Sequence, residues 1–184
     1  MKNVFIIHGA HGTPEENWFP WLKAELEKLD YKVFVPKFPT PENQTLKDWL
    51  EVFKDYEQYF NNDTIVVGHS IGATFLLSVI EKLEKSIKAA LFVSGFVDLL
   101  DNEEFDKINK TFVEHNFDWD KIKQNCSEFF IYHSDNDPYV PLDIARNLAD
   151  KLDRDIVIVK NAGHFNKDAG YDKFNLLLDK IKSL

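Results

Sequence analysis

The chain has 184 residues, enough for one domain with a sizeable core and too few for two comfortable domains. Its formal net charge of -9 repels phosphate backbones, which disfavours nucleic-acid binding, and its single cysteine excludes an intramolecular disulfide. No apolar stretch approaches the roughly 18 residues of a membrane span, and the first apolar run is too short for a secretory signal, so we expect a cytoplasmic protein that binds no membrane.

Six short apolar runs rich in β-branched residues are predicted to form strands. They span residues 3–8, 32–36, 64–68, 89–94, 128–134 and 155–160. Because their hydrophobic residues are continuous rather than alternating, these runs suit strands buried on both faces of a sheet. Apolar residues at helical spacing lie between and after them, in residues 18–29, 46–60, 71–85, 142–152 and 172–184. Strands that alternate with helices predict a parallel α/β sheet in one domain, residues 1–184.

One segment, residues 96–126, breaks the alternation of strands and helices. It holds no clean strand, only weak helical spacing and several aromatic residues, and we expect an insertion of short helices. Residues 96–128, with Glu128 included, hold nine acidic residues and four lysines, a net of about five negative charges. Such a segment is either a solvated excursion or a cap over a binding site.

Ser70 lies in the motif GHSIG, directly after a predicted strand and directly before a predicted helix. This is the context of a nucleophile elbow, in which a sharp turn exposes the serine hydroxyl at the carboxyl edge of the sheet. Bulky side chains at Gly68 or Gly72 would collide with the neighbouring strand or helix. The simpler alternative is an ordinary helix N-cap serine in a glycine turn.

A serine nucleophile needs a base, and the base needs an orienting acid. His164, in NAGHF, follows the last predicted strand and is the expected base. Asp135 and Asp137 follow the fifth strand, and Asp98 follows the fourth. We favour Asp137, because the next residue is a proline that stiffens the loop, and we expect Asp135 to cap its own turn. A plain Asx turn and a plain loop histidine are the structural alternatives.

The stretch IHGAHG at the end of the first strand is predicted to supply backbone donors to the same edge. The N–H of Ile71, next to the serine, and the N–H of Ala10 would form an oxyanion hole, with the N–H of His11 a less favoured donor. His8 and His11 are also metal-ligand types. We expect no metal, because both lie in a strand and its turn and no further ligand cluster is evident.

Taken together, the motifs HGAHG, GHSIGA, SDNDPYVP and NAGHF resemble those of small α/β-hydrolases of the retinoblastoma-binding-protein-9 / YdeN type. The resemblance covers essentially the whole chain. It implies a compact α/β-hydrolase fold with a six-strand, mainly parallel sheet and helices on both faces. It also implies a serine-hydrolase triad of Ser70, Asp137 and His164.

A protein partner is not carried over from that family. The namesake uses a Leu-x-Cys-x-Glu motif to bind retinoblastoma protein, and here Gln124 stands where the leucine of that motif belongs. Cys126 is therefore expected to be a small packing residue, and any protein partner stays unknown.

These features predict a serine hydrolase that cleaves an ester-type acyl bond of a small-molecule substrate and needs no cofactor. His11, Trp18, Trp21, Phe96 and Phe165 lie near the predicted edge by sequence and are the candidates for a substrate pocket, although Trp and Phe residues are most often core. The alternative from another class is a binding or interaction module that keeps the fold with little turnover.

Overall fold

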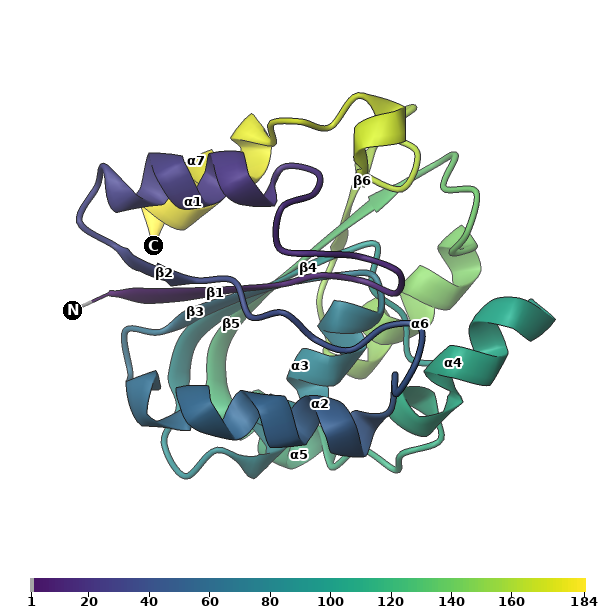
Figure 1. The fold of residues 1–184 in the computed structure, drawn as a ribbon, viewed down its shortest axis with the longest axis horizontal. Helices are drawn as coiled ribbons and strands as arrows, with labels where there is room; N and C mark the ends of the chain where they lie inside the picture. The colour runs from purple at the N-terminus through teal and green to yellow at the C-terminus, as the bar shows by residue number, and fades with distance from the viewer. Residues whose placement is uncertain (1) are drawn as a thin grey trace.

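The computed structural model describes residues 2–184, which form one six-stranded sheet in the order β2-β1-β3-β4-β5-β6 (Figure 1). Every paired strand within this range runs parallel to its neighbour. The strands are β1 (Asn3–Ile7), β2 (Lys32–Phe34), β3 (Ile65–His69), β4 (Ile87–Val93), β5 (Cys126–Ser134) and β6 (Ile156–Val159). The predicted six-strand parallel sheet is confirmed.

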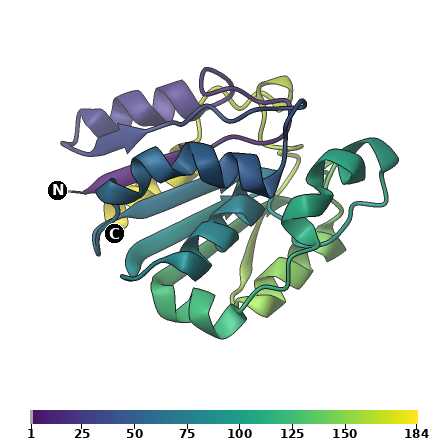
Figure 2. The same ribbon diagram turned by 60° about the horizontal axis from the view of Figure 1, so that its bottom comes forward.

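Helices cover both faces of the sheet, as Figures 1 and 2 show. The α-helices are α1 (Phe19–Glu27), α2 (Leu46–Phe53), α3 (Ile71–Lys82), α4 (Glu103–Val113), α5 (Trp119–Asn125), α6 (Leu142–Lys151) and α7 (Asn175–Ser183). Two 3-10 helices are η1 (Lys54–Tyr59) and η2 (Lys167–Ala169). The helix predicted over residues 46–60 is thus an α-helix that continues as η1 from Lys54.

Alternate residues of each central strand enter two separate cores, because successive side chains of a strand point to opposite faces. Phe5 and Ile7 of β1 pack with residues of α2 and α3, whereas Val4 and Ile6 pack with residues of α1 and α7.

Burial of Cys126 raises the pKa of its thiol to about 12, which fits a packing residue.

Burial on both faces was the wrong prediction for β6. Its two central residues, Val157 and Ile158, are 43% and 40% exposed. The reason is topological, since β6 pairs only with β5 and lies at one edge of the sheet. A continuous apolar run indicates a strand, but the position of that strand in the sheet decides how much of it is buried.

The insertion contains two short helices, α4 and α5, as predicted. The side chain of Gln44 donates to Asn109 of α4 over 2.7 Å, and both residues are buried. The backbone N–H of Leu46 donates to Thr111 over 3.0 Å. Helix α4 is therefore tied to the loop before α2 and to the first residue of α2, which holds it beside the carboxyl edge of the sheet.

Candidate active site

Ser70 occupies a strained turn between β3 and α3. Its φ of 56° and ψ of -129° lie outside the regions that L-residues ordinarily adopt. A Cβ at Gly68 would come within 2.6 Å of the backbone of Ala73, and one at Gly72 within 2.5 Å of the His8 carbonyl oxygen. The Ser70 side chain makes no capping hydrogen bond to α3, so the N-cap alternative does not hold.

The loop after β1 lies directly against this serine. A Cβ at Gly9 would fall 2.9 Å from the Cβ of Ser70, so only a glycine permits this approach. The N–H of His11 donates to the Thr40 hydroxyl over 2.7 Å and is therefore not free to stabilise an oxyanion. Ile71 is the first residue of α3, where an N–H has no partner within its own helix.

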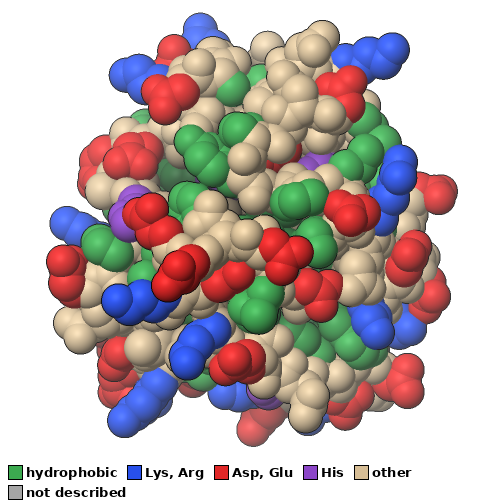
Figure 3. All heavy atoms as spheres, turned by 90° about the vertical axis from the view of Figure 1, so that its right-hand side faces the viewer, with side chains coloured by type: hydrophobic (Ala, Val, Ile, Leu, Met, Phe, Trp, Pro, Cys, Tyr) green, Lys and Arg blue, Asp and Glu red, His purple; other side chains and the backbone are tan. Residues whose placement is uncertain are grey.

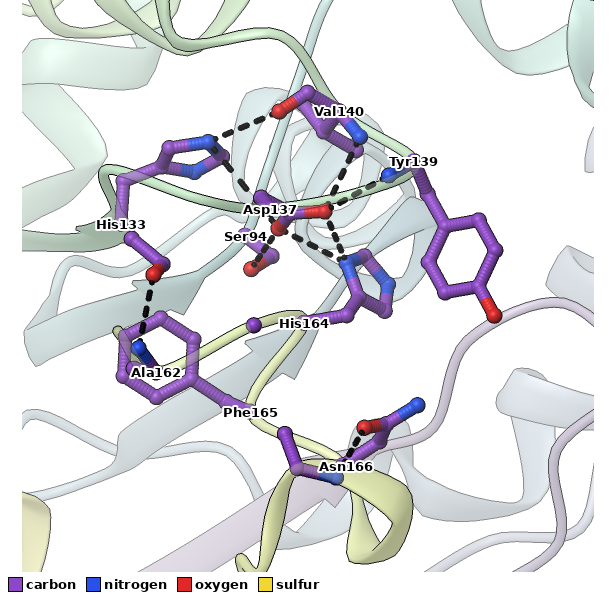
Figure 4. A network of polar contacts seen from close by, with 12 residues as sticks. Ser94, His133, Asp137, Tyr139, Val140, Ala162, His164, Phe165 and Asn166 are labelled. Carbon is purple, nitrogen blue, oxygen red and sulfur yellow. Dashed lines mark hydrogen bonds and ion pairs between the residues drawn. The ribbon is translucent and has the colours of Figure 1, made fainter. Parts of the chain in front are cut away.

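The His164 imidazole is paired with the Asp137 carboxylate. Its Nδ1 lies 2.8 Å from Oδ2 and 3.0 Å from Oδ1 of Asp137 (Figure 4). The Ser94 hydroxyl donates to the same Oδ2 over 2.7 Å, while the N–H groups of Tyr139 and Val140 donate to Oδ1 over 3.0 and 3.1 Å. The structure thus brings together the predicted acid and the predicted base.

The Asp137 carboxyl is held ionised by these partners. Burial by itself would raise its pKa, but the hydrogen bond and charge of His164, with the hydrogen bonds from Ser94 and Tyr139, lower the pKa to about 2. Ser94, directly after β4, was missed by the sequence analysis. Nothing in its local sequence distinguishes it from an ordinary loop serine.

The other two candidate acids have different partners. The Asp98 carboxylate accepts a hydrogen bond from the Asn147 side chain on α6. Asp135 accepts the backbone N–H of Asn161 over 2.7 Å, so the prediction that it caps its own turn is wrong. The adjacency of β5 and β6 places the loops that follow them side by side, and Asp135 bridges those two loops.

A cavity of about 420 Å³ opens at the carboxyl edge of the sheet. Ser70 and His164 both line it, together with Ala10 and His11. Figure 3 looks onto this edge and shows a hollow that contains histidine atoms, bordered by hydrophobic side chains, with many acidic side chains around it. Further lining residues that the sequence analysis missed are Glu16, Asn17, Leu100, Phe105, Asn109, Tyr139, Val140, Asn166, Lys167 and Asp168.

Four of the five predicted pocket residues do not line this cavity; only His11 does. Trp18 and Phe165 are fully buried in the core beneath α1 and α7, and Trp21 packs against that core. Phe96 is 1% exposed and belongs to the core on the opposite face of the sheet. The prediction failed because proximity to a strand end does not tell which way a side chain points.

The buried histidines other than His164 have structural partners. In His8, Nδ1 lies 2.8 Å from the Gly9 carbonyl and Nε2 accepts the N–H of Phe38 over 3.0 Å. His133 lies on the side of Asp137 away from His164 and donates from Nε2 to the Val140 carbonyl over 3.0 Å (Figure 4). Among residues 2–184 no group of three His, Cys, Asp or Glu is arranged to hold a metal ion.

Three buried histidines predict a stability that falls with acidification. Burial lowers the pKa of His8 and His133, and burial with the nearby His164 ring lowers that of His69 to about 3. Below the ordinary histidine value of about 6.5 the unfolded chain then binds more protons than the folded one, so folding stability present at pH 7 is lost as the pH falls. Loss of the Asp137 contribution begins only below pH 4.

The expected result is a free energy of unfolding that declines between pH 7 and pH 4, by up to about 1.4 kcal/mol per pH unit for each such histidine. Urea denaturation at four pH values measures it. His69→Gln retains a donor for the His164 carbonyl but does not titrate, so its decline should be shallower than that of the wild type. Equal slopes would contradict the assignment of His69 as a buried neutral group.

The serine hydrolase family model matches residues 4–183, nearly the whole chain. The chain belongs to the serine hydrolase family. YdeN of Bacillus subtilis is 29% identical over 99% of this chain and 95% of its own length. The serine hydrolase RBBP9 of Rattus norvegicus is 25% identical over 96% of this chain and 91% of its own. The resemblance inferred from the motifs is thus confirmed for the family.

Solved structures support the same conclusion about the fold. The crystal structure of the ydeN gene product from B. subtilis superposes with a TM-score of 0.92, covering 100% of this chain and 98% of that one. Est1E from Butyrivibrio proteoclasticus, solved with ferulic acid bound, matches with a TM-score of 0.74 at 16% identity, over 100% of this chain and 87% of its own. The serine hydrolase therefore has the predicted α/β-hydrolase fold.

No helix in residues 2–184 is long and apolar enough to span a membrane.

Proposed function

We propose that this serine hydrolase cleaves an ester-type acyl bond of a small substrate through a triad of Ser70, His164 and Asp137. The observation that carries the proposal is the Asp137–His164 pair, joined over 2.8 Å at the rim of the cavity that Ser70 lines. An ionised carboxylate on Nδ1 leaves Nε2 of the neutral imidazole as the acceptor for the serine proton. The strained turn at Ser70 supports a nucleophile rather than a capping role.

In the proposed reaction, the Ser70 hydroxyl oxygen attacks the acyl carbon as His164 takes its proton. The backbone N–H groups of Ile71 and Ala10 stabilise the negative charge on the former carbonyl oxygen. His164 then returns the proton to the departing alcohol, which leaves an acyl-serine. A water molecule, deprotonated by His164, attacks that acyl group and releases the acid and the free serine. The scheme uses side chains and backbone groups alone.

A fluorophosphonate probe tests the proposal. We expect the probe to form one stable phosphonyl adduct at Ser70, located by peptide mass spectrometry, and expect Ser70→Ala to form none. Absence of labelling in well-folded wild-type protein would contradict the triad and favour a binding module of the same fold. An adduct on another serine would show that the nucleophile is misassigned.

The wall of the cavity supplied by α4 indicates the shape of the substrate. The Phe105 ring meets the His11 ring at 6.2 Å and the Tyr139 ring at 5.7 Å, and Tyr139 meets His164 at 5.0 Å. These four rings form a row from the loop after β1 to the base. We propose that Phe105 and Tyr139 hold a flat apolar group or the far end of an acyl chain of the substrate.

The expected result for Phe105→Ala is a selective loss on longer acyl chains. Removing one wall of an apolar pocket should lower kcat/KM about tenfold for a p-nitrophenyl hexanoate and leave the acetate nearly unchanged. The matched control is Leu99→Ala, which removes a 44% exposed side chain of the same insertion that does not line the cavity. A loss of equal size on every chain length would contradict a pocket role for Phe105.

A further inference from the structure

The backbone directly before His164 is held by a ladder of side chains from the end of β5 and the loop that follows it, which carries Asp137. Three consecutive N–H groups donate to three consecutive side chains, and each bond joins the loop after β6 to residues 134–136. The pairs are Asn161 to Asp135 at 2.7 Å, Ala162 to Ser134 at 2.9 Å and Gly163 to Asn136 at 2.8 Å. This ladder ends one residue before both His164 and Asp137.

Two members of the ladder are also joined to each other. The Ser134 hydroxyl, on a residue only 1% exposed, donates to the Asn136 side-chain oxygen over 2.7 Å. That oxygen therefore accepts both the Ser134 O–H and the Gly163 N–H. Asn136 itself is solvent-exposed, so its side chain contributes hydrogen bonds rather than buried apolar area.

Alternate residues of the held segment lie in the left-handed region of the backbone. Asn161, Gly163 and Phe165 have φ values of 56°, 53° and 50°, a region that glycine and asparagine adopt readily and phenylalanine disfavours. A segment with alternate residues in that region persists where its surroundings determine it. The side-chain bonds to its successive N–H groups provide that determination.

The carbonyl groups at and after His164 are held by side chains from two other segments of the chain. His69 donates from Nε2 to the His164 carbonyl over 2.8 Å, and Trp18 donates from its indole N–H to the Phe165 carbonyl over 3.0 Å. Trp18 thus contributes to the site from the core and not from the cavity. The main chain of His164 is bounded by fixed peptide groups on both sides.

We propose that Ser134, Asp135 and Asn136 are positioning residues that set the His164 imidazole against Asp137, and that the shared oxygen of Asn136 is the central contact. Because residues 134–137 are continuous, one short peptide both supplies the acid and fixes the main chain of the base. The distance between the His164 imidazole and the Asp137 carboxylate is then independent of small movements of β6. This strand lies at one edge of the sheet and is partly exposed. The inference rests on the proposed role of His164 as the base.

The variants Asn136→Ala and Asn136→Asp test it. Alanine removes the shared acceptor, whereas aspartate retains an oxygen at the same place. For Asn136→Ala we expect kcat on a p-nitrophenyl ester to fall about tenfold with KM unchanged, and the downfield proton resonance of the His164 Nδ1–H bonded to Asp137 to broaden or disappear. For Asn136→Asp we expect most of the wild-type kcat and most of the intensity of this resonance.

The control for general loss of stability is Asp118→Ala. Asp118 caps α5 by accepting the N–H of Lys121 over 3.0 Å, remote from the cavity lining. It should lower the melting temperature and leave kcat and the resonance unchanged. If Asn136→Ala lowers only the melting temperature, or if Asn136→Asp restores neither signal, the positioning role is wrong. If Asn136→Ala does not fold, the variant Asp135→Ala, at an exposed position, replaces it. We expect Asp135→Ala to lower kcat and to weaken the His164 Nδ1–H resonance, each by less than Asn136→Ala would. No change in either quantity would equally overturn the proposal.

Failure of this inference is distinguishable from failure of the proposed function. If His164→Ala abolishes turnover while the Asn136 variants behave as the wild type, the base assignment stands and only the positioning role falls. If His164→Ala retains turnover, the base assignment itself falls. The resonance is measured on the resting protein and reports the His164–Asp137 geometry without any substrate.

Discussion

Replacing Ser70 with alanine is expected to lower kcat for a short p-nitrophenyl ester by a factor on the order of 10⁴ to 10⁶ while the fold survives. The loss is large because the hydroxyl forms the covalent bond in the proposed mechanism. The fold should survive because the Ser70 side chain makes no capping bond to α3 and alanine is smaller.

Steady-state kinetics with circular dichroism measure both halves of this expectation. The matched control is Ser78→Ala in α3, the helix that follows Ser70, because the Ser78 hydroxyl is buried and has no hydrogen-bond partner among residues 2–184. We expect Ser78→Ala to keep wild-type turnover. A folded Ser70→Ala protein that retains more than a tenth of wild-type activity would mean that the nucleophile lies elsewhere.

Replacing Asp137 with asparagine is expected to lower kcat by about 10²- to 10⁴-fold. The hydrogen bonds at the carboxylate give the reason. An asparagine oxygen in place of Oδ1 would still accept the N–H groups of Tyr139 and Val140, which leaves its NH₂ group facing Nδ1 of His164. A donor at that place favours the tautomer with the proton on Nε2, and such an imidazole is unable to take the serine proton.

The other two candidate acids provide matched controls for this prediction. Asp98→Asn keeps an oxygen near Asn147 and should leave kcat near that of the wild type. Asp135→Asn keeps an oxygen acceptor for the Asn161 N–H and should cost at most about 1 kcal/mol of stability. Measured kcat and melting temperature for the three variants decide among them. A larger catalytic loss in either control than in Asp137→Asn would move the acid to that residue.

Much of the site was predictable from the sequence because its signals are local. A strand, a glycine-flanked serine and a helix follow one another within a dozen residues around Ser70, and the glycine at position 68 is required because a Cβ there would meet the nearby backbone of Ala73. Candidates for the acid and base follow because parallel strands bring their carboxyl ends to one edge. The following proline and the family resemblance favour Asp137 as the acid. In the structure its carboxylate lies 2.8 Å from Nδ1 of His164.

The lining of the cavity was not predictable in the same way. Trp18 and Phe165 lie beside site segments in the sequence, yet their rings enter the core under α1 and α7, while Phe105 and Tyr139 reach the cavity from α4 and the loop after β5. Composition and spacing show that a residue is aromatic and near a strand end. Only the packing of helices on the two faces decides which aromatic rings fill the core and which are left at the rim.

The sequence by itself therefore determined the strand and helix segments, the glycine-flanked serine turn and the order of candidate nucleophile, acid and base, since each is recognised from local residue patterns or from the order of those patterns along the chain. The tertiary structure alone decided that the His11 N–H is taken by Thr40, 29 residues away, and that residues 134–136 hold the N–H groups of residues 161–163. Both sets of bonds exist because β1 and β6 each end beside a particular neighbouring loop. A hydrogen bond between distant segments leaves no periodic trace in either one, so the paired strands and packed loops have to be present before such a bond is defined.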